Sequence, residues 1–378
     1  MEPLNILHVF RAPVGGLFRH VLDLSREQIA RGHRVGLIAD LRTGGTRADD
    51  ALRLIEPSLA LGLSRVAMHR QPNPDDLFAL AHVIRRAKQA QADVVHGHGA
   101  KGGAYSRLTF GNPRAVRAYT PHGGSLMFSH DTLAGKFYLT TERLLMLRGD
   151  LFLFESAFSA DMFRNKIGDP RGLVRVVHNG VSPAEFAPVV TGPDATDLMF
   201  LGELRHLKGI HVLIDAIAQL RRDGRNVTAT FIGDGPDREA LQAHVDRDGI
   251  NSAVRFQPAM PARQAMTLGR IMVAPSRFES LPYVVLEAAA AGKSLITTQV
   301  GGIPEIYGPL SNTLVPPSDP TALARAIGQA LDRPDVMAEI AQKLRERVQV
   351  SFSVESMADG VLGGYRAAIE ALGKSGRR

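Results

Sequence analysis

Short apolar runs alternate with amphipathic helical stretches along almost the whole chain. A first series of strand-like runs lies at residues 5–10, 34–39, 93–98, 115–120, 151–156 and 174–180, and a second lies at 197–203, 228–235, 270–276 and 294–299. Apolar runs of this length, separated by helical stretches, are typical of βαβ units with parallel strands. The two series therefore predict an α/β protein with two domains, each built on a parallel sheet.

The segment between the two series marks the expected domain boundary. Residues 182–197, "SPAEFAPVVTGPDATD", are rich in Pro, Ala and Thr, which is typical of a linker. A length of 378 residues also suits two domains. We expect a first domain over residues 1–185 and a second over residues 195–361.

Composition narrows the class of protein. The chain has no cysteine, which excludes disulfides, thiolate chemistry and cysteine-bound metal. Its start, "MEPLNILHVF", has no cationic leader, and no run of about eighteen apolar residues occurs in the sequence. These features predict a soluble, cytoplasmic protein.

The formal net charge of +7 lies entirely in residues 1–190, because residues 191–378 carry equal numbers of acidic and basic side chains. Tryptophan is absent and the arginines are not interleaved with aromatic residues, so we expect no nucleic-acid partner. The basic excess favours an anionic ligand, or peripheral contact with anionic lipid at the inner face of the membrane. The alternative is that this charge only keeps the protein in solution.

Ligands of parallel sheets bind beyond the carboxyl ends of the strands, so the residues that follow each strand are candidates for a site. Gly15 and Gly16 follow the first run and open a helix whose N–H groups could meet a ligand, although a plain turn would use the same residues. After the third run, "HGHGAKGG" contains His96, His98 and Lys101. No carboxylate lies nearby to complete a metal site, so we favour a substrate-facing loop whose lysine and glycines meet an anion.

Three further segments follow strands. His122 stands in "TPHGG", between a proline and two glycines, which is unusual for a core histidine. In "GELRHLKG", Arg205 and Lys208 suit a pair of ligand phosphates, whereas two solvated cations beside the positive start of a helix would be unfavourable. The turn "FIGDGPDRE" contains Gly233, but neither it nor "APVGGL" matches a dinucleotide fingerprint or a Walker P-loop.

The stretch "RFESLPYVVLEAAAAG" carries two glutamates in an apolar setting. Pro282 suits the first position of a helix and Gly292 suits its end, so we expect a helix over residues 282–291. This helix has almost no polar face, which is typical of a buried helix. A carboxylate on it needs a partner, because burying a bare charge is costly. Glu287 is therefore a candidate for ligand binding.

In this order, the segments "GGLFRHVLDLSREQIARGHRV", "TPHGG", "VHNGV", "GELRHLKG", "GDGPDRE" and "RFESLPYVVLEAAAAGKSLITTQVGGIPEIY" resemble the retaining, nucleotide-sugar-dependent glycosyltransferases of the GT4 family (group 1). Glu279 and Glu287 match the family's E-x7-E motif. The resemblance implies a GT-B fold: two Rossmann-like domains with doubly wound parallel sheets, facing across a cleft, with the donor held mainly by the second and the acceptor by the first. A final helix, about residues 362–378, would pack back on the first domain.

The resemblance also implies roles for individual residues. The catalytic group would be His122, Glu279, Lys208 and Arg205. The residues that hold the donor nucleotide and its phosphates would be Gly15, Gly16, Gly202, Arg205, Lys208, Gly233, Ser280, Leu281, Pro282 and Glu287. Glu287 would accept hydrogen bonds from the ribose, and the two cations would neutralise the diphosphate without a metal. We assign His96, His98 and Lys101 to the acceptor side.

Two positions depart from the commoner family pattern. Glu203 stands where an arginine usually follows the first glycine of the "GELR" loop, so we assign that arginine's role to Arg205. Ser280 replaces a glycine in the loop between the two glutamates, so some donor contacts should differ.

The reaction implied is transfer of a sugar with retained anomeric configuration, by a front-face path in which the departing phosphate helps to deprotonate the acceptor. The donor would be a UDP-sugar, with a GDP-sugar as the alternative, and no cofactor or metal is expected. The acceptor would be a carbohydrate or a polyprenyl-diphosphate-linked sugar, as in polysaccharide or glycolipid synthesis. A glycosidase carboxylate pair is disfavoured because Glu287 is committed to the ribose. A nucleotide-sugar epimerase of the same fold and a catalytically silent scaffold subunit remain alternatives.

Overall fold

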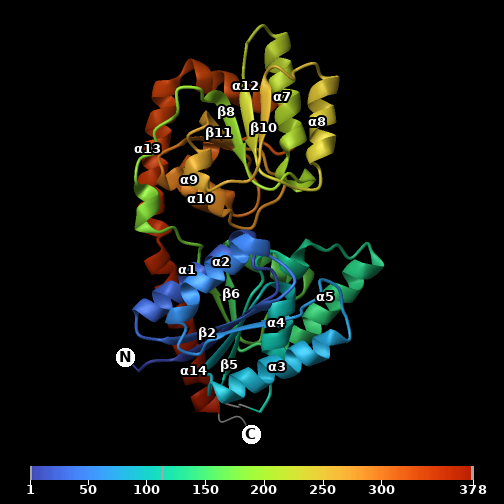
Figure 1. Ribbon diagram of the computed structural model, residues 1–378, viewed down its shortest axis with the longest axis vertical. Coiled ribbons are helices and arrows are strands. Elements are labelled where there is room, and N and C mark those ends of the chain that lie inside the picture. The colour runs from blue at the N-terminus through green and yellow to red at the C-terminus, as the bar shows by residue number, and fades with distance from the viewer. Residues whose placement is uncertain (1, 112–114, 376–378) are drawn as a thin grey trace. The chain divides into compact units, whose positions relative to one another are not determined.

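The protein, described by a computed structural model over residues 2–111 and 115–375, consists of two compact units. The first unit is Met1–Asn179 with Val354–Arg378, and the second is Gly180–Ser353. Figure 1 shows that each unit is a sheet flanked by helices. The chain enters the second unit once and returns to the first for its last helix.

The sheet of the first unit has seven parallel strands in the order β3-β2-β1-β4-β5-β6-β7. These strands are β1 (Asn5–Phe10), β2 (Arg34–Asp40), β3 (Leu63–Val66), β4 (Val94–His98), β5 (Val116–Thr120), β6 (Leu151–Phe154) and β7 (Leu173–Val176). The order reverses between β1 and β4, which is the switch point of a doubly wound sheet. In the register of these two strands, His8 lies beside His96 and Phe10 beside His98.

Helices cover both faces of this sheet. They are α1 (Gly15–Ala30), α2 (Gly45–Ile55), α3 (Asp75–Gln89), α4 (Gly99–Leu108), α5 (Leu133–Met146), α6 (Ala157–Lys166) and α14 (Val354–Ser375), with short 3₁₀ turns η1 (Glu56–Ser58) and η2 (Gly124–Met127). Alternate residues of β1 face opposite sides. Ile6 packs in one apolar cluster with Tyr365 of α14, and Leu7 packs in another with Val83 of α3. His8 therefore shares the face of Ile6.

The second unit is a smaller parallel sheet in the order β10-β9-β8-β11-β12. Its strands are β8 (Thr196–Leu201), β9 (Ala229–Ile232), β10 (Val254–Gln257), β11 (Gly269–Ala274) and β12 (Ser294–Thr297). Its helices are α7 (Ile210–Arg222), α8 (Arg238–Arg247), α9 (Ala262–Ala265), α10 (Tyr283–Ala290), α11 (Ile303–Tyr307), α12 (Pro320–Asp332) and α13 (Pro334–Ser351), and its 3₁₀ turns are η3 (Pro183–Phe186), η4 (His206–Lys208) and η5 (Gly308–Thr313). The order reverses between β8 and β11, so the loops after these strands flank a second switch point.

The structure moves several expected boundaries. Residues 180–185 belong to the second unit, and α14 begins at Val354 rather than near residue 362, so residues 354–361 belong to the first unit. Residues 376–378 of the expected final helix lie outside the described residues. The helix expected over residues 282–291 is shorter, with Pro282 as its cap. None of the helices within residues 2–111 and 115–375 combines the length and the apolar character needed to cross a bilayer.

Candidate functional site

Glycines bring the loops after β8, β9 and β11 into close contact. Gly233, after β9, has a φ of +147°, and a Cβ there would lie 1.9 Å from the carbonyl oxygen of Gly202 after β8. Gly209, after η4, has a φ of +68°, and a Cβ there would lie 1.9 Å from the carbonyl oxygen of Pro275 after β11. Both glycines have a positive φ and no room for a side chain, so no other residue fits without moving the backbone. Two of the predicted donor residues, Gly202 and Gly233, are thus neighbours.

Lys208 and Glu279 form an ion pair at this edge of the sheet. The Lys208 Nζ lies 2.6 Å from Glu279 Oε1, and the Ser276 hydroxyl donates to the same oxygen at 2.7 Å. Glu279 is almost buried, with 9% of its surface exposed. A Cβ on Gly301 would lie 1.6 Å from the Glu279 carbonyl oxygen, so the following loop also packs on this residue. The carboxylate is therefore held by one cation and one hydroxyl.

Arg205 directly precedes the turn η4, which carries Lys208, but the Arg205 side chain takes no part in the ion pair. The guanidinium is 3.8 Å from Glu203, and both side chains are about half exposed, at 48% and 52%. A contact of this kind between exposed charges is weak, so it leaves the arginine able to reach an anionic ligand.

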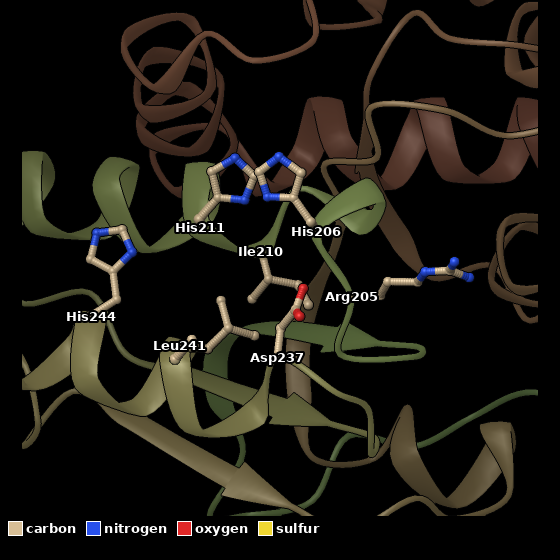
Figure 2. Close-up of a pocket in the computed structure, with 8 residues that line it drawn as sticks. Arg205, His206, Ile210, His211, Asp237, Leu241 and His244 are labelled. Carbon is tan, nitrogen blue, oxygen red and sulfur yellow. The ribbon is translucent and has the colours of Figure 1, made fainter. Parts of the chain in front are cut away.

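A cavity of about 300 Å³ lies on one side of the Arg205 loop. Its lining comes from the start of η4 and the residue before it, from the start of α7, and from α8 and the residue before it. The lining residues are Arg205, His206, Ile210, His211, Asp237, Ala240, Leu241 and His244. Figure 2 shows the Arg205 side chain directed away from the three histidines. The His206 and His211 rings stack with centroids 4.5 Å apart. Lys208, Glu279 and Glu287 do not line this cavity, so it is separate from the ion pair.

The helix α10 follows the segment Ser280 to Pro282 and has no side-chain cap at its N-terminus. Its first-turn N–H groups lie at the positive end of the helix dipole, which suits an anion. The Leu281 side chain is buried in the apolar core, so only its backbone is available to a ligand. Glu287 is half-buried on the same stripe as Val284, whereas the rest of α10 is buried.

The first unit contains a cluster of five histidines around its switch point. His8 lies on β1, His96 and His98 on β4, His20 on α1 and His122 after β5. Four are almost fully buried, and His122 is half-buried. His122 also has a φ of +49°, a left-handed conformation that is uncommon outside glycine and is found at functional sites.

Hydrogen bonds connect these rings to neutral groups and to one another. His8 Nε2 lies 2.8 Å from the Gln28 Oε1, His8 Nδ1 lies 2.9 Å from His98 Nε2, and His98 Nδ1 lies 3.1 Å from His122 Nε2. His96 bonds to Tyr365 and Thr120 through its two nitrogens.

The pKa values of the cluster are low because the rings are buried away from water. Burial lowers the pKa of His8 from 6.5 to about 4 and that of His122 to about 3. Burial, with repulsion from neighbouring histidines, holds the pKa values of His20, His96 and His98 well below 6.5. All five imidazoles are therefore neutral near pH 7.

Histidine clusters can bind metal ions, and three groups within the described residues bring potential ligand atoms within 4.8 Å of one another: His8, His96 and His98; His20, His98 and His122; Asp215, His244 and Asp248. In the first two groups, both nitrogens of His8 and of His98 already form hydrogen bonds. A metal would have to displace those bonds inside a buried cluster. The hydrogen-bonded arrangement therefore accounts for these rings without a metal.

The structure separates the three residues that we assigned to the acceptor side. His96 is fully buried and uses both nitrogens internally, which argues against direct contact with an acceptor. His98 connects to His122, whereas Lys101 pairs with Asp76 and donates to the Gln71 carbonyl oxygen at 3.2 Å.

The glycines of the same segment were expected to face an anion, and this expectation is wrong. Gly102 and Gly103 lie inside α4, where a Cβ would come within 2.1 Å of the Val9 carbonyl oxygen or of the Tyr119 ring. These glycines let the helix pack closely on the sheet.

Gly15 and Gly16 are the first two residues of α1, and both are exposed. Gly15 has a φ of +62°, and no side chain caps the helix. Their N–H groups are thus at an open, positive helix end, as the sequence suggested.

Sequence reasoning missed His8, His20 and Gln28 as partners of His98 and His122. These contacts depend on the pairing of β4 with β1 across the switch point and on the packing of the buried face of α1 over both strands. The local sequence indicates neither of them.

Comparison with known proteins assigns both units. The profile of glycosyltransferase family 4 matches residues 14–185, and the profile of glycosyl transferases group 1 matches residues 195–333. The chain belongs to glycosyltransferase family 4. Together with the two parallel α/β units, this confirms the predicted GT-B fold of the enzyme.

Relatives of this glycosyltransferase cover most of its length. A glycogen synthase of Mycobacterium tuberculosis is 26% identical over 392 residues, which cover 94% of this chain and 92% of the relative. A D-inositol 3-phosphate glycosyltransferase of Saccharomonospora viridis is 27% identical and covers 81% of this chain and 78% of the relative. The crystal structure of Anabaena Alr3699/HepE in complex with UDP is similar in fold, with a TM-score of 0.77 at 20% identity over 96% of this chain and 99% of that one.

Proposed function

We propose that this family 4 glycosyltransferase transfers a sugar from a UDP-sugar, with retention of configuration and without a metal, to a carbohydrate or lipid-linked acceptor. The observation that carries the proposal is the group of Lys208, Glu279 and Arg205 beside the uncapped start of α10. Two cations and the positive N-terminal end of a helix at the carboxyl edge of a parallel sheet suit a diphosphate. The Anabaena protein, which has the same fold, binds UDP.

In this proposal each part of the nucleotide-sugar has a partner in the protein. Arg205 and Lys208 neutralise the diphosphate, the backbone from Ser280 to Pro282 meets the phosphates or the sugar, and the half-buried Glu287 accepts hydrogen bonds from the ribose. Gly202 and Gly233 keep the neighbouring loops free of side chains. A GDP-sugar is the alternative donor, because none of these contacts reads the base.

The reaction breaks the bond between the anomeric carbon and the phosphate oxygen and forms a bond from the acceptor oxygen to the same face of that carbon. The acceptor proton passes to the departing phosphate, whose charge Lys208 and Arg205 stabilise. Glu279 faces the transferred sugar, and His122 positions it through a hydrogen bond. Neither residue attacks the anomeric carbon.

One surface of the first unit favours an acceptor held at a membrane. The helix α5 exposes Leu133, Phe137 and Leu144 along one stripe, with Lys136 and Arg143 also exposed on the same helix. Apolar side chains flanked by cations are typical of helices that lie on anionic lipid. A polyprenyl-diphosphate-linked sugar, on the pathway to a polysaccharide or glycolipid, would be presented at such a surface.

The donor assignment is tested by thermal shift of the full-length protein against UDP, GDP, ADP and their sugar conjugates, with EDTA present. A ligand that binds only the native state raises the melting temperature. We expect a shift with UDP and UDP-sugars. If the melting temperature rises only with nucleotides of another base, the donor carries that base instead of uracil. If it rises with none of the nucleotides, a silent scaffold subunit is favoured.

Two variants test the site. We expect Glu287→Ala to weaken UDP binding about tenfold or more, because hydrogen bonds to a charged group are lost, whereas the exposed Glu239→Ala should not. We expect His122→Ala to reduce turnover with nucleotide binding nearly intact, whereas the exposed His130→Ala should do neither. Unchanged behaviour of both site variants would refute the assignment, and a nucleotide-sugar product without transfer would indicate an epimerase.

The membrane surface has its own test. We expect the protein to sediment with vesicles that contain phosphatidylglycerol but not with vesicles of phosphatidylcholine alone, and Leu133→Ser/Phe137→Ser to reduce this binding. Val190→Ser, at an exposed apolar residue of the second unit, is the control. Equal binding by the double variant would place the lipid contact elsewhere.

A further inference from the structure

The hydrogen-bond chain from Gln28 to His122 has a direction. It begins at the buried Gln28 Oε1, and a carboxamide oxygen can only accept a hydrogen bond. The His8 Nε2, 2.8 Å away, must therefore carry the proton of that bond. The other nitrogen of a neutral imidazole has no proton, so His8 Nδ1 can only accept.

The same rule applies at each following ring. His98 Nε2 must donate to His8 Nδ1 across 2.9 Å, which leaves His98 Nδ1 as an acceptor. His122 Nε2 must then donate to His98 Nδ1 across 3.1 Å. This leaves His122 Nδ1 without a proton, and within the described residues it forms no hydrogen bond.

Burial supports the assumption that every ring in the chain is neutral. It lowers the pKa of His8 to about 4, holds that of His98 well below 6.5 and lowers that of His122 to about 3. In the chain from Gln28 to His122, these rings hydrogen-bond to a carboxamide and to other imidazoles, and none of those partners is a charged group that would favour an imidazolium.

We propose that Gln28 is a positioning residue that sets the tautomer of His122 through His8 and His98, so that His122 offers an unprotonated Nδ1 to a ligand hydroxyl. The assignment of that hydroxyl to the transferred sugar rests on the proposed function. The hydroxyl must donate, so a sugar with fluorine or hydrogen at that position loses the contact. The left-handed backbone of His122 fits this role, because such strain persists where a side chain must be aimed.

The tautomer can be measured without any substrate. In protein labelled with ¹⁵N-histidine, two-bond ¹H–¹⁵N spectra near pH 7.5 distinguish a protonated from an unprotonated ring nitrogen, and loss of one signal set in His122→Ala assigns that residue. We expect the wild-type His122 to carry its proton on Nε2. A proton on Nδ1 in the wild-type protein would overturn the proposal.

A matched pair of variants tests the origin of the tautomer. Gln28→Met keeps nearly the same volume but removes the acceptor, so we expect the His122 signals to shift toward a mixture of both tautomers. Thr120→Val removes the hydrogen bond to His96 Nε2, in the same buried region but outside the Gln28–His8–His98–His122 chain, and should leave His122 unchanged. An unchanged His122 spectrum in a folded Gln28→Met protein, or an equal shift in both variants, would refute the proposal.

Activity supplies a second, separable readout. With the UDP-sugar that the binding screen identifies, we expect Gln28→Met to lower kcat about tenfold with the KM for the donor nearly unchanged, and Thr120→Val to change neither. If the spectra follow the prediction but no sugar is transferred, the proposed function fails and the tautomer assignment stands. If sugar is transferred but the spectra or kcat do not respond to Gln28→Met, the assignment fails.

Discussion

The buried histidines predict that the first unit loses stability in mild acid. His8, His20, His96 and His98 are at most 2% exposed, and burial keeps their pKa values below the ordinary 6.5. As the pH falls below 6.5, the unfolded chain takes up protons that the folded unit does not. Stability is therefore complete above pH 6.5 and decreases as the pH falls toward the folded pKa values.

The magnitude follows from proton linkage. Between about pH 7.5 and about pH 5.5, each such histidine should reduce the free energy of unfolding by about 1.4 kcal/mol, and the four together by about 6 kcal/mol. This loss is comparable with the whole stability of a typical domain, about 5–15 kcal/mol. His122 is left out because it is only half-buried.

Hydrogen exchange of the full-length protein, followed by mass spectrometry and corrected for the intrinsic effect of pH, measures this loss. We expect the free energy of opening to fall by several kcal/mol in peptides from β1 and β4. Peptides from β9 and β11 of the second unit are an internal control, because His206, His211 and His244 are at least partly exposed. A change below about 1.5 kcal/mol in β1 and β4 would show that the cluster is not neutral and buried in the native state.

Three further predictions concern the second unit. Lys208→Met should lower the free energy of unfolding by about 2 kcal/mol by leaving Glu279 unpaired, and adding Glu279→Gln should restore stability in urea titrations but not UDP binding. Gly233→Ala should destabilise the protein by at least about 2 kcal/mol more than Gly224→Ala, whose Cβ would meet nothing, and equal melting temperatures would contradict this. EDTA should leave the transfer rate unchanged, whereas a loss restored by a divalent cation would require a metal.

The two sheets could be predicted because their central strands are apolar runs that can be recognised from a short stretch of sequence. The two strands that it missed, β3 and β10, have only four residues each and mix polar with apolar side chains, as in "LSRV" and "VRFQ". Both lie at the edge of their sheets, where a strand needs less apolar surface.

In the predicted site, individual residues could be recognised from their sequence neighbours, but contacts between segments far apart in the chain could not. Glu279, Glu287 and Lys208 were recognisable from the spacing of nearby residues, but the ion pair between two of them joins loops 71 positions apart. The error at His96 has a simple cause. His96 and His98 share one face of β4, and that face is covered by α14, which begins more than 250 residues later in the chain.

The return of α14 to the first unit fixes the order in which the protein can mature on the ribosome. Residues 180–353 are complete while the first sheet still lacks the helix that covers Ile6 and supplies Tyr365 to His96. A product truncated before Val354 would keep an intact second unit but leave an apolar sheet face uncovered, the kind of surface that chaperones and proteases recognise. The helix α14, which is translated after the whole second unit, is therefore needed to complete the first unit.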